Sequence, residues 1–273
     1  MCLPWRTTDV AVTGASGTGA YDSSRPSIAR VYDYLLGGKD NYAADRALAD
    51  ELLAQQPEIR RNARENREYM QRVVRVIAGA GVAQFLDIGT GLPTGHNVHE
   101  VARSVIPDAR VVYVDNDEVV AAHARALLAF DAGVEFVLGD LRQPAEVVAR
   151  ASATLDFAKP VALLIISMLH FVADDLQAHA TIRAYGQSLA PGSYLAISHW
   201  QYRPDDDEEL TRQYASAVHD LARRGKAEVA SLLPADWQLL EPGLVPVPAW
   251  RPEARDLPGT PGIPFLGAVL RKP

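Results

Sequence analysis

From residue 84 onward, short apolar runs alternate with segments of helical periodicity, and this alternation restricts the fold more than any other feature. Such βαβ repetition predicts an α/β protein with a Rossmann-like, doubly wound and mostly parallel sheet, because right-handed crossover helices cover both faces. Continuous apolar runs are typical of strands buried on both sides. The expected strands are Gln84–Ile88, Arg110–Asp115, Val134–Leu138, Val161–Ser167 and Tyr194–Ser198. The expected helices lie near Gly95–Val105, Glu118–Ala129, Ala145–Ala151 and Leu176–Leu189.

The N-terminal part of the chain has a different pattern. Residues 1–24 are rich in Gly, Ser and Thr and lack periodicity, so we expect a flexible tail. Residues 25–80 predict three helices, which run from Pro26 to the Gly37-Gly38 pair, from a cap at Asp40 or Asn41 to Pro57, and from Glu58 to Ala78. The third helix carries interleaved Arg and Glu side chains, which are typical of a solvated face, although Arg67 could reach a ligand carboxylate.

The C-terminal part is less regular. A helical insertion is expected over about 206–233, and two strands are expected near Trp237–Glu241 and Phe265–Leu270. Seven prolines fall between Pro242 and Pro264, which predicts an ordered loop or an extended flap. Residues 81–273 are therefore interpreted as one ligand-binding domain.

Composition excludes several classes of protein. A net charge of −7 argues against nucleic acid as a partner, and the single cysteine, Cys2, excludes an intrachain disulfide and a zinc site of several thiolates. His96 and His99 have no carboxylate at matching helical spacing, so no metal is expected. No signal peptide is apparent, and the longest apolar run, Val161–Ala173, is too short to span a membrane. We therefore expect a cytoplasmic protein, whose oligomeric state the sequence leaves open.

Glycines and a carboxylate follow the first expected strand. Gly89 and Gly91 allow a tight turn and a close approach of the backbone to a ligand, with Thr90 between them. The third glycine of a dinucleotide fingerprint is absent, because position 94 is Thr94. Asp87 at the strand end suits an ammonium group better than a phosphate; alternatively, it caps a helix or anchors the turn.

A second carboxylate, Asp115, ends the next strand and is followed by Asn116. A carboxylate at this place can accept hydrogen bonds from both hydroxyls of a ribose. The alternative role is capping of the following helix, for which Asp117 is better placed.

The third and fourth strands end on further candidates. Gly139-Asp140-Leu141 could contact an adenine, with Asp140 accepting from the exocyclic amine and Leu141 covering the ring, or it could be an ordinary turn. Ser167 and His170 follow the fourth strand and are expected near the reacting end of a ligand. His170 is a weak candidate for a general base; alternatively, it packs beneath the loop with a backbone partner.

This set of motifs resembles the class I S-adenosylmethionine-dependent methyltransferases. More closely, the chain from about residue 25 resembles an actinobacterial S-adenosyl methyltransferase family that was formerly a domain of unknown function. The resemblance rests on PSIARVYDYLLGGKDNYAADRALAD from Pro26, on FLDIGTGLPTGHNVHEVA from Phe85, and on EPGLVPVPAWRP and GAVLRKP near the C-terminus.

The resemblance implies a seven-stranded sheet with an antiparallel last strand, S-adenosylmethionine as the cofactor, and a helical lid over residues 25–80. It implies that Asp87, Gly89 and Gly91 surround the methionine part, that Asp115 takes the ribose, and that Asp140 and Leu141 take the adenine. Residues 39–42 either face the methionine part or the acceptor, or merely continue a turn.

The expected function is direct SN2 transfer of a methyl group to an unidentified small molecule. Most of the rate acceleration would then come from positioning, without an obligatory base. Two alternatives remain at this point: a non-catalytic module that binds S-adenosylmethionine or S-adenosylhomocysteine, and an NAD-dependent oxidoreductase.

Overall fold

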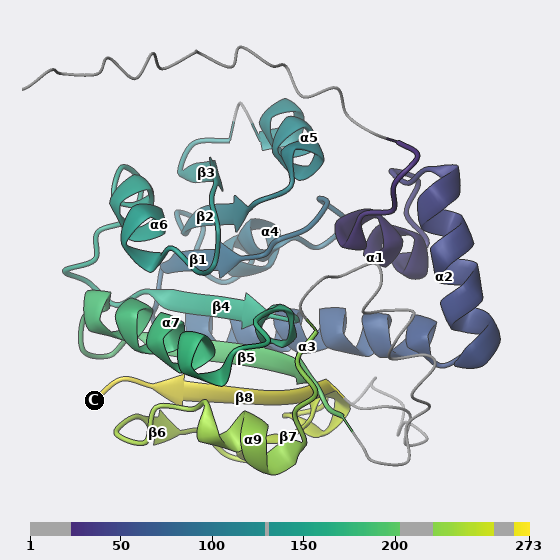
Figure 1. The fold of residues 1–273 in the computed structure, drawn as a ribbon. Coiled ribbons are helices and arrows are strands. Elements are labelled where there is room, and N and C mark those ends of the chain that lie inside the picture. The colour runs from purple at the N-terminus through teal and green to yellow at the C-terminus, as the bar shows by residue number, and fades with distance from the viewer. Residues whose placement is uncertain (1–22, 129–130, 203–220, 254–264) are drawn as a thin grey trace, which may run out of the picture.

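The computed structural model describes residues 23–128, 131–202, 221–253 and 265–273 (Figure 1). Its centre is an eight-stranded sheet in the order β3-β2-β1-β4-β5-β8-β6, with β7 paired to β8. Strands β1 to β5 are parallel, and β8 is antiparallel to β5, β6 and β7. The strands are β1 (Gln84–Ile88), β2 (Arg110–Asp115), β3 (Val134–Leu138), β4 (Ala162–Ile166), β5 (Tyr194–Trp200), β6 (Gln238–Leu239), β7 (Val245–Pro246) and β8 (Phe265–Arg271).

The predicted fold class is confirmed, including the antiparallel last strand, but the expected number of seven strands is wrong. The additional strand is β7, a two-residue pairing inside the proline-rich segment that was expected to be a loop or flap. Proline lacks a backbone N–H, so a strand that contains Pro246 gives no periodic signal and can form only a short edge pairing.

Helices cover both faces of the sheet (Figure 1). Alternate residues of β1 show the two layers, because Leu86 and Ile88 belong to one buried cluster and Phe85 to the other. The first cluster contains buried residues of α6, α7 and α9, and the second contains those of α3 and α4. The helices that follow β1 are α4 (Val98–Arg103), α5 (Glu118–Leu128), α6 (Pro144–Ala151), α7 (Asp175–Ser188) and α9 (Lys226–Ser231), together with short 3-10 turns at Leu169–Phe171 and Val247–Ala249.

Three N-terminal helices precede the sheet: α1 (Ile28–Leu36), α2 (Ala43–Gln55) and α3 (Ile59–Gly79). Gly37 ends α1 with a left-handed φ of 85°, as the Gly-Gly pair predicts. The cap of α2 is Tyr42 rather than Asp40 or Asn41, because Asp45 reaches back to the Tyr42 backbone N–H. Helices α1 and α2 and the start of α3 share a small core of their own. The rest of α3 packs in the second main cluster against the sheet, and the lid over residues 25–80 stays a prediction.

Several predictions fall wholly or partly outside the described residues. Residues 1–22 of the expected tail, 203–220 of the expected insertion and the end of the proline-rich segment lie there. Within the expected insertion, the described helix is α9. No helix in the described ranges is both long enough and apolar enough to cross a membrane.

The arginine face of α3 is only partly solvated, which corrects the expectation for Arg72. This side chain is 3% exposed, and its guanidinium donates to the carbonyls of Trp250 and Val247 at 3.1 and 2.7 Å. Arg72 therefore holds the segment of Val247 and Trp250 against α3. Periodicity alone does not reveal a buried arginine, because its partners are backbone carbonyls far away in sequence.

We expect Arg72→Met to lower the free energy of unfolding by about 2–4 kcal/mol, because two buried carbonyls lose their donor. The matched control is Arg64→Met on the same helix, where the side chain is exposed and the change should stay below about 0.5 kcal/mol. Denaturant unfolding followed by circular dichroism measures both. Equal stability of the two variants would contradict a structural role for Arg72.

Candidate functional site

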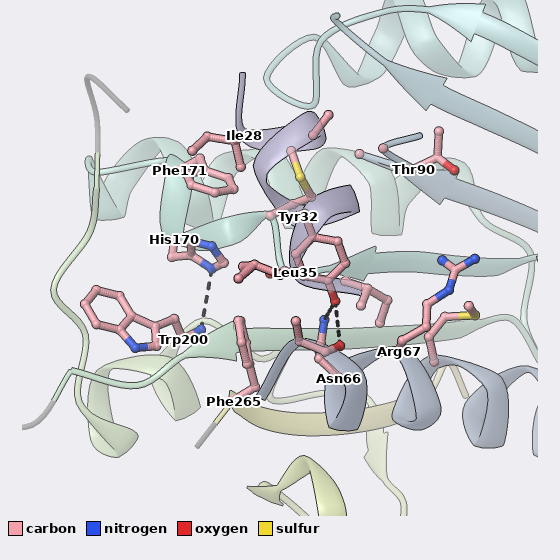
Figure 2. A pocket seen from close by; sticks show the side chains of 18 of the residues that line it. Ile28, Tyr32, Leu35, Asn66, Arg67, Thr90, His170, Phe171, Trp200 and Phe265 are labelled. Carbon is pink, nitrogen blue, oxygen red and sulfur yellow. Dashed lines mark hydrogen bonds between the residues drawn. The ribbon is translucent and has the colours of Figure 1, made fainter. Parts of the chain in front are cut away.

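A cavity of about 370 Å³ opens at the carboxyl ends of β1, β2 and β4, between the sheet and the N-terminal helices. This position is the switch point of the sheet, because the chain moves outward from β1 to β3 and then crosses to β4. Figure 2 shows α1 side chains above the cavity and α3 side chains along its lower side. The cavity brings together these sequence-predicted residues: Asp87, Gly89, Thr90, Gly91, Asp115, Asn116, Ser167 and His170.

The glycine turn after β1 lies against both neighbouring strands. Gly89 and Gly91 have left-handed φ values of 75° and 64°, which favour glycine. A Cβ at Gly89 would lie 2.1 Å from Met168 Sδ, so the turn also requires glycine for space. The Gly89 N–H donates to the Val114 carbonyl at 2.7 Å. The turn is thus fixed at the floor of the cavity.

Asp115 lies at the end of β2 and accepts backbone hydrogen bonds on both carboxylate oxygens. The Gly91 N–H donates to Oδ2 at 2.9 Å, and the Asp117 N–H donates to Oδ1 at 3.0 Å. Burial raises the pKa of this carboxyl, and the two N–H donors oppose that effect. Each oxygen retains a lone pair, so the fixed carboxylate can still accept from two adjacent hydroxyls.

Buried Asp87 and half-buried Arg67 line the same cavity and carry opposite charges. Asp87 is 6% exposed, and burial raises its pKa to about 7, against the opposing effect of the Arg67 charge and of a Thr90 hydrogen bond. The Arg67 guanidinium donates from Nη2 to Asn97 Oδ1 at 3.0 Å. Its Nε is buried and has no hydrogen-bond partner among the described residues. The partnerless Nε of Arg67 could donate to an anionic group of a ligand, and Asp87 could accept from a cationic group of the same ligand.

Ser167 and His170 follow β4. Ser167 has a φ of 60°, and its N–H donates to Ser198 Oγ at 2.9 Å. His170 is 1% exposed, and its pKa lies well below the usual value, chiefly because of burial. Its Nδ1 accepts from the Trp200 N–H at 3.4 Å, so the ring proton lies on Nε2. His170 thus has the backbone partner that the packing alternative expects, and its role as a general base stays a prediction.

A protein-family model described as S-adenosyl methyltransferase matches residues 15–273. The chain belongs to the S-adenosyl methyltransferase family. The family expected from the sequence is thereby confirmed, and the cofactor is S-adenosylmethionine.

Solved structures of similar proteins agree with this family. A candidate methyltransferase from Thermobifida fusca is 40% identical, with a TM-score of 0.84, over 91% of this chain and 96% of its own. A DUF574 family protein from Streptomyces avermitilis is 39% identical, with a TM-score of 0.87, over 92% of this chain and 99% of its own. No curated protein sequence matches the chain significantly.

The Gly139-Asp140-Leu141 segment does not meet the other candidates in this methyltransferase. These residues are not among those that line the cavity. Arg142 donates to both carboxylate oxygens of Asp140, the shorter bond being 2.6 Å, and this hydrogen bonding lowers the pKa of the carboxyl. Leu141 is buried in the core beside α6. In this structure the segment forms a turn after β3, and its contact with an adenine stays a prediction.

The site also contains residues that the sequence did not single out. Ser27 Oγ donates to Asp117 Oδ2 at 2.7 Å and so joins the start of α1 to the loop after β2. Asp117 Oδ1 accepts from the Val119 N–H at 2.7 Å, which confirms its expected capping role. The Ser27 contact spans 90 positions, and no local pattern predicts it.

Residues 39–42 lie beside the cavity rather than inside it. Lys39 and Asp40 line an adjoining hollow together with Pro93, Thr94 and Gly95. The Asp33 carboxylate accepts from the Asp40 N–H at 3.0 Å and from Asn41 Nδ2 at 2.9 Å, so this turn is held by its own helix. Tyr42 is 40% exposed.

Proposed function

We propose that this methyltransferase binds S-adenosylmethionine in the cavity at the switch point and transfers its methyl group directly to a small molecule. The observation that supports the assignment is the convergence of Asp115, Asp87 and Arg67 on one cavity. Asp115 would accept from the ribose hydroxyls, in keeping with its fixed orientation and remaining lone pairs.

The amino-acid end of the cofactor matches the charges beside the glycine turn. Its ammonium would lie against Asp87, and its carboxylate would accept from Arg67, whose Nε lacks a partner. Gly89, Thr90 and Gly91 supply backbone that a Cβ would otherwise obstruct. The ligand's two charges complement those of the chain, which lowers the cost of keeping both buried.

We expect Arg67→Met to weaken binding of S-adenosylmethionine by about 10- to 100-fold, because a buried carboxylate loses its charged donor. Binding of 5'-methylthioadenosine, which lacks the amino-acid end, should not change. Arg64→Met on the exposed face of α3 is the matched control. Isothermal titration calorimetry measures the affinity of each ligand for the parent and for both variants. Equal weakening of both ligands in Arg67→Met would contradict the contact with the carboxylate.

S-adenosylmethionine supplies a methyl group on a sulfonium, whose sulfur keeps the electron pair of the C–S bond that breaks. The chain contributes alignment and exclusion of water, for which the buried cavity under α1 is suited. His170 would donate from Nε2 rather than accept a proton, because its Nδ1 already accepts from Trp200. The proton released by a hydroxyl or amine acceptor would pass to water.

Titration with S-adenosylmethionine, S-adenosylhomocysteine and NAD tests this function against its alternatives. We expect micromolar binding of both sulfur compounds and none of NAD. Binding of NAD alone would favour an oxidoreductase. Binding of both sulfur compounds without methyl release, in a screen of acceptors with radiolabelled cofactor, would favour the non-catalytic module.

A further inference from the structure

The cavity has two ends of opposite character. The formally charged residues that line it, Arg67, Asp87, Asp115 and Asp117, all gather at the β1–β2 end. Among the described residues that line the other end, none carries a formal charge when His170 is neutral. Figure 2 shows this separation, with Thr90 and Arg67 on one side and His170, Phe171 and Trp200 on the other.

Aromatic rings form the wall of the uncharged end. His170 and Phe171 follow β4, Trp200 ends β5, and Phe265 begins β8. The His170 ring centroid lies 4.2 Å from that of Phe171 and 6.0 Å from that of Phe265. Three adjacent strands thus place their aromatic side chains around one space, and α1 covers it with Ile28, Tyr32 and Leu35.

Several polar groups at this end bond to one another. Tyr32 Oη donates to the Ala63 carbonyl at 3.0 Å and accepts from Asn66 Nδ2 at 3.1 Å. Asn66 Oδ1 accepts from Ser198 Oγ at 2.6 Å, and Ser198 Oγ accepts from the Ser167 N–H. This chain of bonds leaves neutral groups for a ligand, among them Ser167 Oγ, the second N–H of Asn66 and Gln56 Oε1, which is buried without a partner among the described residues. A charged ligand would therefore lose its hydration without a counter-ion among the described residues of this end.

We propose that the uncharged end binds the methyl acceptor and that the acceptor is an uncharged, flat aromatic molecule. This inference rests on the proposed function. Aromatic walls favour a π-system, and the neutral polar groups of this end, such as Ser167 Oγ after β4, can orient one polar atom of it. A carboxylate, a phosphate or an ammonium on the ring is disfavoured because the described residues of this end offer no opposite charge.

Three probes with the same ring system test the charge preference: 2-naphthol, 2-naphthoate and 2-naphthylmethylammonium. Each is titrated by calorimetry into the full chain, both free and saturated with S-adenosylhomocysteine. We expect 2-naphthol to bind at least about tenfold more tightly than either ion. Equal or tighter binding of an ion, or binding of none of the three to protein that holds S-adenosylhomocysteine, would overturn the proposal.

Two substitutions at Phe171, a half-buried residue, place the probe in the cavity. Phe171→Ala should weaken 2-naphthol binding by about tenfold and leave S-adenosylhomocysteine binding unchanged. Phe171→Lys should shift the preference toward 2-naphthoate, a gain that an unfolded variant could not give. Retention of the parent preference in Phe171→Lys would overturn the assignment. Failure of S-adenosylhomocysteine to bind the parent would instead refute the proposed function. The titrations of the three probes into free protein would then still test whether the aromatic end binds an uncharged ring.

Discussion

Asp115→Ala is expected to weaken binding of both S-adenosylmethionine and 5'-methylthioadenosine by at least about 100-fold. The reason is that Asp115 lies at the end of β2 with both oxygens fixed by backbone N–H groups and with one lone pair left on each. Two hydroxyls of one ribose would lose their charged acceptor together. Calorimetry with each ligand measures the loss.

The substitution also removes the acceptor of the Gly91 and Asp117 N–H groups, so part of the loss could arise from the loop itself. Asp108→Ala, at an exposed carboxylate before β2, controls for the general effect of removing a negative charge. Thermal unfolding without ligand separates the two causes. If Asp115→Ala binds 5'-methylthioadenosine as tightly as the parent does, Asp115 does not hold the ribose.

Secondary structure was predictable where the chain makes regular, doubly covered strands. The bounds of β1, β2 and β3 agree with the expected ones, because each is a short, mostly apolar run that glycine or a charged residue ends. The expected strand near Trp237–Glu241 shortens to the two residues of β6. Its side chains are exposed at the sheet edge, so burial gives no apolar pattern there.

The site was predictable only in part, for a related reason. The carboxyl ends of parallel strands meet at one edge, so the meeting of Asp87 with Asp115 follows from topology alone. Whether a carboxylate at that edge is available depends on its neighbours. Asp140 occupies the equivalent place after β3, but its side chain pairs with Arg142, two residues later, and does not line the cavity. Side-chain pairing of that kind depends on rotamers, and a periodic pattern does not contain them.

The residues of α1 that line the cavity could not be predicted from the sequence, for another reason. Ser27 reaches Asp117, and Tyr32 enters the network of Asn66, only because the three N-terminal helices pack on one another and over the strand ends. The resemblance predicted helices over the cavity. Which residues of these helices line the cavity depends on how the helices pack.

Binding of S-adenosylmethionine is expected to weaken about tenfold for each pH unit below 7. Burial raises the pKa of Asp87 to about 7, so the free protein holds this carboxyl protonated in mildly acidic solution. An ammonium beside it favours the carboxylate and lowers that pKa in the complex. The complex therefore binds fewer protons than the free protein below pH about 7, and association must release one. Calorimetry at pH 6 in two buffers of different ionisation enthalpy counts the released proton.

Two comparisons assign the proton to Asp87 rather than to Asp115, whose pKa is also raised by burial. Asp87→Asn keeps the shape and removes the ionisation, so its affinity should be lower at neutral pH and flat between pH 6 and 7. The ligand 5'-methylthioadenosine carries the ribose without the ammonium, so it should bind the parent without releasing a proton. Proton release with 5'-methylthioadenosine would move the titrating group to the ribose end of the cavity, and the contact between Asp87 and the ammonium would then be wrong.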